Sequence, residues 1–428
     1  MQNQPSTKSI AAQPKFHMVN KLAEDRPDAN YAEENQNSEK LMLLGASSRW
    51  MAESARLANL SVVAVDLFND WDTCQAAKTI KIKKISEAIP LASQIKPAAI
   101  LFGGGLETHR GLIVGLEQVA QLLNIEEQSL NRMRNPDEWC SAFQNEGIRI
   151  PKWAHRPPGS NDQLRWLFKV TDSAGGQGVG HWTSESRMAS DRPGFWQEFI
   201  GGEPSSALFI ADNAGCRCLG LFRQLIGVPE FGAMGFRFSG AIGPLPPTTQ
   251  QANQLAVIAR VLERDFSIHG IVGVDLIDTS EALVPVEINP RPTATCELLE
   301  RATGVSIVGL HCSAFDWPSD NCDANLAARG VANEKYHGKA IVFWRGDDAF
   351  VVNQDVFKTF CELRRRKVMA DIPQLDSEIL PGHPIVTVFA DGESQNEVFS
   401  QLKDRAKIVY DAAESARTEL CGGNVPPG

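Results

Sequence analysis

The sequence predicts a multidomain protein of α/β and α+β class. Three observations predict this class: strands and helices alternate in residues 40–130, paired strands with glycine-rich turns dominate residues 131–330, and a smaller set of strands and helices occupies residues 331–428. A chain of 428 residues is expected to fold into two or three packed units. We therefore expect a parallel sheet first, a strand-rich central unit second and a small α/β cap at the C-terminus.

Composition excludes several classes of protein. The net charge, 42 − 52 = −10, argues against a nucleic-acid binder. No run of eighteen apolar residues and no apolar segment near the N-terminus occur, so we expect neither a membrane span nor a secretory signal. Nine scattered cysteines without a C-x-x-C spacing indicate a reducing, cytoplasmic compartment. Cys216 and Cys218 are expected as thiols on a strand rather than as zinc ligands.

Residues 1–39 are rich in polar side chains and contain few large apolar ones. They cannot bury much apolar surface, so we expect a disordered tail, with an amphipathic partner-binding segment as the alternative. The next unit should be a parallel sheet with crossover helices. Apolar runs predict strands at 41–45, 61–66 and 98–102 and a helix at 50–59. Ligands bind at the carboxyl ends of such strands, so Glu107 and His109, which follow the last of them, are candidates for contacts with a substrate.

The central unit begins with a predicted helix at 135–147 and an entry strand at 148–151. The apolar strand Trp166–Val170 carries one lysine, Lys169, and runs into Thr171–Gly180, which has four glycines in six residues. Such a loop lets backbone N–H groups surround an anion, and a strand lysine beside it suits a nucleotide phosphate. The alternative is a flexible turn between two strands.

Further strands and a helix complete the central unit. A strand near Phe195 ends in a polar break with Glu198 and Glu203, which can contact a purine and a ribose. The elements expected next are a hairpin of strands 207–212 and 216–225, a substrate-lining loop at 236–244 and a helix at 249–266. Arg223, at the end of the hairpin, either binds a substrate carboxylate or is an ion-paired surface residue.

The most informative segment is a predicted β-hairpin of strands at 271–277 and 282–288. Glu287 and Asn289 lie two residues apart and so share a face, and Asp275 lies on the strand that should pair with them. Two carboxylates and an amide oxygen suit a hard cation such as Mg²⁺. The alternative, a surface hairpin with scattered charges, is disfavoured because Glu287 lies within an apolar run and needs a partner.

The C-terminal unit is predicted to contain strands at 339–343 and 384–390 and a helix at 395–414. It also holds a basic cluster at 364–367, which we expect to be a solvated face.

In this order and at these separations, the glycine loop, the acidic break and the hairpin resemble the ATP-grasp superfamily over residues 41–420. The most specific match is the segment E-I-N-P-R at Glu287–Arg291, with its spacing to Asp275. The resemblance implies an ATP-grasp fold with a Rossmann-like pre-ATP domain. It implies that Asp275, Glu287 and Asn289 bind Mg²⁺, with Mn²⁺ as a substitute, and that Arg291 steadies the transferred group.

The resemblance also implies an ATP site. Lys169 would contact the phosphates and the glycine loop would close over them. Glu198 and Ile200 would read the adenine, and Glu203 would bind the ribose. The full set of implied nucleotide contacts is Arg134, Lys169, Gly175, Gly176, Gly178, Gln197, Glu198, Ile200 and Glu203. Arg223 and Arg291 are the implied catalytic residues.

The implied function is an ADP-forming ligase that joins a carboxylate to an amine through an acyl phosphate. Segments at 104–107, 197–203 and 223–225 also resemble ligases of one-carbon carrier cofactor synthesis (methanofuran or methanopterin type), such as the tyramine–glutamate ligases, which points to glutamate. We expect small-molecule substrates, no nucleic-acid or membrane partner, and a homodimer as one option. The alternatives are a bicarbonate-activating, carboxylase-type enzyme and an ATP-binding protein without catalysis.

Overall fold

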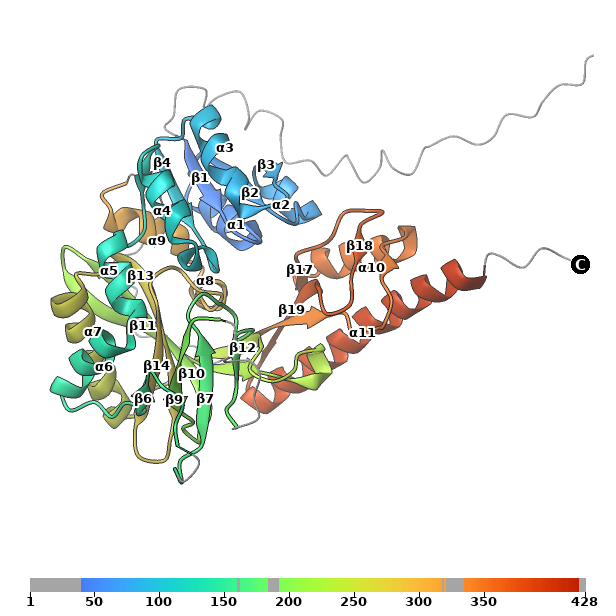
Figure 1. The fold of residues 1–428 in the computed structure, drawn as a ribbon. Coiled ribbons are helices and arrows are strands. Elements are labelled where there is room, and N and C mark those ends of the chain that lie inside the picture. Colours follow the sequence, from blue (N-terminus) through green and yellow to red (C-terminus); the bar gives the residue numbers. More distant parts are fainter. Residues whose placement is uncertain (1–39, 160–161, 184–191, 318, 321–334, 423–428) are drawn as a thin grey trace, which may run out of the picture. The chain divides into compact units, whose positions relative to one another are not determined.

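The computed structural model describes five ranges of the chain: 40–159, 162–183, 192–317, 319–320 and 335–422. The expected disordered tail at 1–39 and the expected boundary at 331 lie outside the described residues. Within the described ranges the chain forms a parallel sheet, a small antiparallel sheet and a large antiparallel sheet (Figure 1).

The apolar runs after residue 40 form a five-stranded parallel sheet. Its strand order is β3-β2-β1-β4-β5, and every pair is parallel. Its elements are β1 (Leu41–Leu44), α1 (Arg49–Leu57), β2 (Val62–Asp66), α2 (Trp71–Ala76), β3 (Lys78–Lys81), α3 (Ala88–Ile95), β4 (Ala99–Phe102), α4 (Arg110–Glu117) and β5 (Gln121–Leu122). The predicted parallel sheet is confirmed. The strand order reverses between β1 and β4, and the loop after β4 contains Glu107.

A small antiparallel sheet follows helices α5 (Glu127–Arg134) and α6 (Pro136–Asn145). Its order is β6-β9-β7-β8, with strands β6 (Trp153–Ala154), β7 (Trp166–Val170), β8 (Val179–His181) and β9 (Gly194–Glu198). The glycine loop is the connection between β7 and β8. The predicted entry strand at 148–151 is wrong, because ladder pairing with β9 begins only at Trp153.

The large antiparallel sheet contains the predicted hairpins. Its order is β14-β13-β10-β11-β12-β15-β19-β17. Its strands are β10 (Glu203–Asp212), β11 (Gly215–Ile226), β12 (Phe238–Leu245), β13 (Gly270–Asp278), β14 (Leu283–Asn289), β15 (Tyr336–Phe343), β17 (Met369–Ala370) and β19 (Pro384–Gly392). Helix α7 (Thr249–Phe266) shares a core with Phe209 of β10. Helices α8 (Cys296–Thr303) and α9 (Ile307–Ala314) share another with Leu208, so they cover the opposite face.

Phe236 and Phe238 of the loop predicted at 236–244 do line a cavity, but the loop is wrong in its secondary structure, because residues 238–245 form strand β12. Its glycines mark close packing rather than a loop. A Cβ atom at Gly240 would lie 2.1 Å from the Lys339 carbonyl oxygen, and one at Gly243 would lie 2.6 Å from the Phe222 ring. Glycine in a strand interior is typical of such close approaches of neighbouring groups.

The C-terminal strands continue the large sheet. Strand β15 pairs with β12, and β19 pairs with β15. Around this end lie β16 (Phe350–Val351), β18 (Glu378–Ile379), α10 (Gln354–Arg365) and α11 (Gln395–Gly422). Their apolar core contains Trp344 and Phe360 together with Leu225 of β11 and Ile242 of β12. The predicted strands and helix of this region are confirmed, and the domain boundaries stay predictions.

A buried ion network joins α1 to the large sheet. Arg49, which is 1% exposed, donates to Asp371 at 3.0 and 3.2 Å and to Glu53 at 3.2 Å, and it also pairs with Glu297 on α8. Lys339 on β15 donates to the same Glu297 at 2.5 Å. Burial disfavours the charge of Arg49, but the three carboxylates outweigh it and raise its pKa well above the usual value. The network therefore stays ionised.

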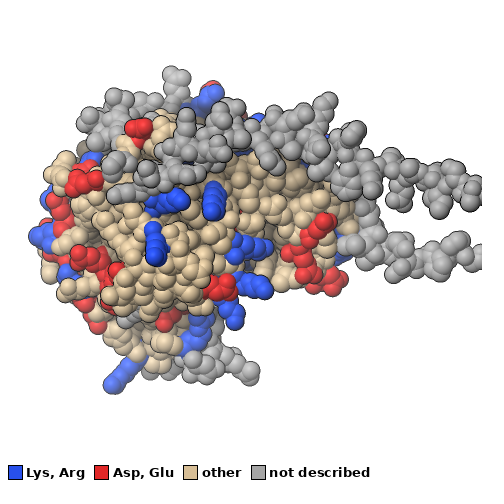
Figure 2. Space-filling model, turned by 90° about the horizontal axis from the view of Figure 1, so that it is seen from above, with Lys and Arg blue, Asp and Glu red and all other residues tan. Residues whose placement is uncertain are grey.

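Basic and acidic side chains are interspersed on the described part of the face that Figure 2 shows. Within the basic cluster 364–367 the last three residues are exposed, as expected. Arg364 is the exception, because it pairs with Glu53 and with Asp72. Among the described residues, no helix is both long and apolar enough to cross a membrane.

Cys216 and Cys218 lie on β11 and pack against the core beneath α7, which confirms thiols on a strand. Burial raises the pKa of each thiol to about 12. Thiols that stay protonated are poor metal ligands and poor nucleophiles.

Candidate active site

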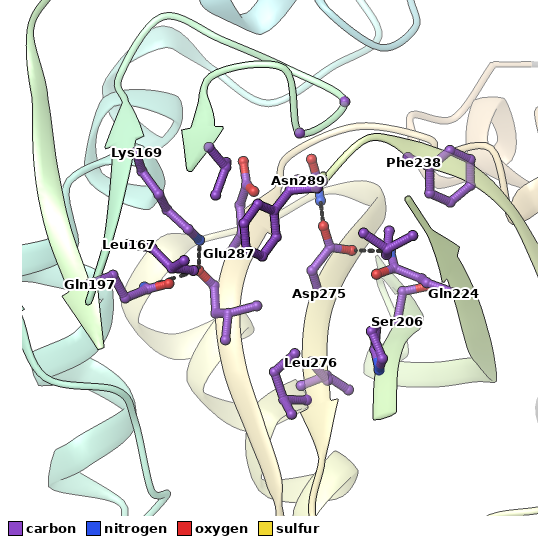
Figure 3. A pocket seen from close by; sticks show the side chains of 18 of the residues that line it. Leu167, Lys169, Gln197, Ser206, Gln224, Phe238, Asp275, Leu276, Glu287 and Asn289 are labelled. Atoms are coloured by element: carbon purple, nitrogen blue, oxygen red, sulfur yellow. Dashed lines mark hydrogen bonds between the residues drawn. The ribbon is translucent and has the colours of Figure 1, made fainter. Parts of the chain in front are cut away.

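The acidic hairpin brings its two carboxylates face to face. Asp275 on β13 is the register partner of Glu287 on β14, and Asn289 pairs with Gly273. The Asp275 carboxylate accepts hydrogen bonds from the Gln224 amide at 2.8 Å and from the Asn289 amide at 3.1 Å (Figure 3). The Glu287 carboxylate makes no hydrogen bond or ion pair with another described side chain. The predicted convergence of these three side chains is therefore present.

The two carboxylates destabilise each other as anions. Burial, followed by repulsion from Glu287, raises the pKa of Asp275 to about 6. A cation between them would remove this repulsion, so the pair suits a hard divalent metal. Asn289 presents its N–H group to Asp275 and its oxygen to Arg291, so its side-chain amide must turn to become a ligand. Within the described ranges no group of three His, Cys, Asp or Glu side chains can hold a metal ion.

Arg291 is held by a carboxylate from the parallel sheet. Its Nε and a terminal nitrogen donate to Glu107 at 2.8 and 2.7 Å, and it also donates to Asn289 at 3.2 Å. Glu107 is 1% exposed, and the Arg291 charge outweighs the effect of burial and lowers its pKa. A Cβ atom at Gly104 would lie 3.1 Å from the guanidinium carbon, so the glycines after β4 let Arg291 pack on the backbone. His109 is exposed.

Lys169 links the small sheet to the hairpin. Its ammonium group donates to the Val286 carbonyl at 3.1 Å, and the Gln197 amide donates to the same oxygen at 3.3 Å (Figure 3). Burial lowers the pKa of Lys169, while the carboxylates of Glu287 and Asp275 oppose this effect. Lys169 and the acidic hairpin line one cavity, and the Lys169 ammonium group points toward the hairpin across it.

The glycine loop packs against β12 and the segment before it. Gly175 and Gly176 both have positive φ, +63° and +77°. A Cβ atom at Gly176 would lie 1.8 Å from the Phe236 carbonyl oxygen, so this position requires glycine. The Phe238 N–H donates to the Gly175 carbonyl at 3.2 Å, which joins the loop to the large sheet. Gly178 packs beside Ser173 and is not among the cavity-lining residues.

The polar break after β9 is only partly directed at the cavity. Gln197, Glu198 and Ile200 line it, and the Glu198 carboxylate accepts from the Lys152 N–H at 3.0 Å. Glu203 forms an ion pair with Arg223, and neither lines the cavity. The geometry therefore supports neither a contact of Glu203 with a ribose nor a contact of Arg223 with a substrate.

Arg134 lies beside the glycine loop. Its guanidinium donates to the Thr171 carbonyl at 2.5 Å. It lines a smaller cavity together with Lys169, Gly175 and Glu287.

The cavity that Lys169, Asp275 and Glu287 line, which we call the main cavity because it contains the acidic hairpin, has a volume of about 380 Å³. This lies within the range of small-molecule sites, roughly 300–1,000 Å³. Several lining residues were missed by the sequence analysis: Ser206, Gln224, Ile226, Thr293 and Thr295. The threonines follow Arg291 at alternate positions, which is the one signal that could have indicated them.

Comparison with known proteins decides the fold. Residues 138–295 match the family model of an ATP-grasp domain. The chain has the ATP-grasp fold. The ATP-grasp match contains Lys169, Asp275, Glu287 and Arg291, whereas Glu107 lies outside it. A search of curated proteins finds no match.

Solved structures share this ATP-grasp fold at low sequence identity. N5-carboxyaminoimidazole synthase from Aspergillus clavatus is 11% identical, with a TM-score of 0.64, covering 89% of this chain and 99% of that one. L-amino acid ligase from Bacillus licheniformis is 13% identical, with a TM-score of 0.63 and coverage of 86% and 97%. Biotin carboxylase from Campylobacter jejuni is 12% identical, with a TM-score of 0.63 and coverage of 85% and 89%.

Proposed function

We propose that the chain is an ATP- and Mg²⁺-dependent, ADP-forming ligase that joins a carboxylate to an amine through an acyl phosphate. The observation that carries this proposal is that one cavity is lined by Lys169 of the small sheet, by Asp275 and Glu287 of the large sheet, and by Arg291, which follows β14. A phosphoryl transfer needs positioning and charge neutralisation above all, and these four side chains offer both.

Each group has a role in the proposal. Lys169 and Arg134 bind phosphates, and residues 197–200 contact the adenine. Asp275 and Glu287, with a turned Asn289, hold Mg²⁺ or Mn²⁺, which neutralises phosphate charge when bound. The glycine loop excludes water, which would otherwise hydrolyse an acyl phosphate.

Arg291 is best placed to stabilise the transferred phosphoryl group, because Glu107 and Asn289 fix the orientation of its guanidinium. A fixed donor needs little reorganisation as charge develops in the transition state.

A second candidate is a bicarbonate-activating enzyme. It is favoured by the fold shared with biotin carboxylase and N5-carboxyaminoimidazole synthase. The L-amino acid ligase, which has the same fold, favours the carboxylate–amine reaction instead. Glutamate as the acid, a place in one-carbon cofactor synthesis, and a homodimer stay predictions of the sequence.

The test is product analysis with Mg-ATP, hydroxylamine and a panel of carboxylic acids. ADP together with a hydroxamate of one acid would support the ligase. AMP and pyrophosphate would contradict acyl phosphate chemistry. ADP release that depends on bicarbonate and rises with biotin would favour the second candidate, and ATP binding without turnover would favour a non-catalytic protein.

A further inference from the structure

The main cavity differs in character on the two sides of Asp275. Lys169 and Gln197 lie on one side, and Ser206, Gln224 and Phe238 lie on the other (Figure 3). Ile226 also lines the cavity and is the register partner of Phe238. We call Ser206, Gln224, Ile226 and Phe238 the neutral compartment, because none of these side chains carries a charge.

Ser206 has a buried hydroxyl group with no partner. The residue is 4% exposed, and its Oγ makes no hydrogen bond within the described structure. It lies on β10 directly beside Asp275, whose carboxylate oxygens are taken by Gln224 and Asn289. Buried polar atoms without partners are rare in proteins, and each requires an explanation. A ligand group with a hydrogen-bonding atom would satisfy this hydroxyl.

Among the described residues, no cationic side chain points into the neutral compartment. The cations among the described cavity-lining residues are Lys169 and Arg291. Lys169 lies on the far side of Asp275, and Arg291 is turned toward Glu107 and Asn289. Arg223 precedes Gln224 and so projects from the opposite face of β11, where it pairs with Glu203. A carboxylate in this compartment would lie near Asp275 without a counter-ion.

We propose that the neutral compartment binds the non-reacting part of the acid substrate and that the Ser206 hydroxyl hydrogen-bonds an uncharged group there. The site thereby selects acids with one carboxylate over dicarboxylates, since a second buried carboxylate would be unpaired. This selection opposes glutamate, the acid that the sequence predicts. This inference rests on the proposed carboxylate-activating function.

The first test compares acids in matched pairs: glutamine with glutamate, asparagine with aspartate, and glutaramate with glutarate. Each pair keeps the size of the side chain and changes its charge. We expect ADP and hydroxamate formation with the amide member of each pair. The kcat/KM for the dicarboxylate member should be at least about 100-fold lower, because its second charge has no partner in the compartment. Preferred turnover of a dicarboxylate would overturn the inference and leave the ligase intact. No turnover with any acid would overturn both.

The second test separates a substrate contact from a nucleotide contact. Ser206→Ala should raise the KM for the neutral acid about 3- to 10-fold, the size of one hydrogen bond, and leave the KM for ATP unchanged. Its melting temperature should not fall, because the variant removes an unpaired buried hydroxyl. Ser205→Ala is the matched control, since Ser205 is equally buried, bonds to the Glu203 carbonyl at 3.3 Å and faces away. A raised KM for ATP in Ser206→Ala would refute the assignment.

Discussion

The substitution Glu287→Gln should stabilise the metal-free protein while removing its activity. The pKa of Asp275 is raised from 3.8 to about 6. At about 1.4 kcal/mol per pKa unit, ionised Asp275 lowers the free energy of unfolding by about 3 kcal/mol. Burial is the largest cause and Glu287 the second. We therefore assign about 1 kcal/mol to the repulsion from Glu287 and expect a net gain smaller than this in the variant, because buried Lys169 loses the attraction of the same carboxylate.

The pH dependence gives the sign of this effect. The pKa of Asp275 is higher in the folded than in the unfolded chain, so folding favours the protonated form. Its contribution therefore makes stability fall as pH rises from about 4 to about 6, with no further change above that window. In Glu287→Gln this fall should be smaller, and the stability gain should be present at pH 7.5 and nearly absent at pH 4.

The assay is urea unfolding of both proteins at these pH values, with and without Mg²⁺, together with ADP release. Mg²⁺ should stabilise the wild type more than the variant, and ADP release should fall by about 100-fold or more, because a proposed metal ligand is lost. Glu281→Gln is the control: this side chain is 78% exposed on the turn of the same hairpin, and its loss should change stability by less than about 0.5 kcal/mol. A less stable variant at pH 7.5, or one with full turnover, would refute the reasoning.

Three further substitutions test other contacts. Gly176→Ala places a Cβ atom 1.8 Å from the Phe236 carbonyl at positive φ, so the loop must move, and a several-fold higher KM for ATP is expected in steady-state kinetics. Glu107→Gln leaves buried Arg291 without its anion, and calorimetric melting should show a loss of about 3 kcal/mol, so an unchanged melting temperature would count against the ion pair. Arg49→Met leaves buried Asp371 without its cation and takes one of two cations from Glu297 and from Glu53, with an expected loss of about 3–5 kcal/mol at pH 7 that shrinks below pH 4 as the carboxylates protonate, measured by urea unfolding.

Local sequence patterns correctly predicted those helices and strands whose structure depends mainly on their own residues. Helix α7 occupies 249–266 as predicted, because its apolar positions follow one stripe and Thr248 caps its start. The arrangement of the acidic hairpin was predictable because side chains alternate along a strand, which places Glu287 and Asn289 on one face. Strand β12 was predicted as a loop because of its glycines. These glycines are needed where side chains and carbonyl groups of neighbouring strands approach closely, which the local sequence does not show.

The polar partners in the site depend on how distant strands pair, which no local pattern encodes. The β10–β11 ladder shifts register between Leu208 and Phe209, so the residues opposite each other cannot be counted from the turn. That pairing places Arg223 beside Ser205 and away from the cavity. It also lets the Gln224 amide donate a hydrogen bond to the Asp275 carboxylate. Glu107 was recognised as a candidate, but its role as the partner of Arg291 required two separate sheets to meet.

The continuity of the large sheet limits how this protein can be dissected. Strand β12 has β11 on one side and β15 on the other. A fragment that stops before residue 335 would expose a bare strand edge with its unpaired N–H and C=O groups, a template for aggregation. It would also uncover Leu225 and Ile242, which the C-terminal helices now shield. Expression of the strands of the candidate site alone should yield inclusion bodies, and the protein must be made and tested as one piece.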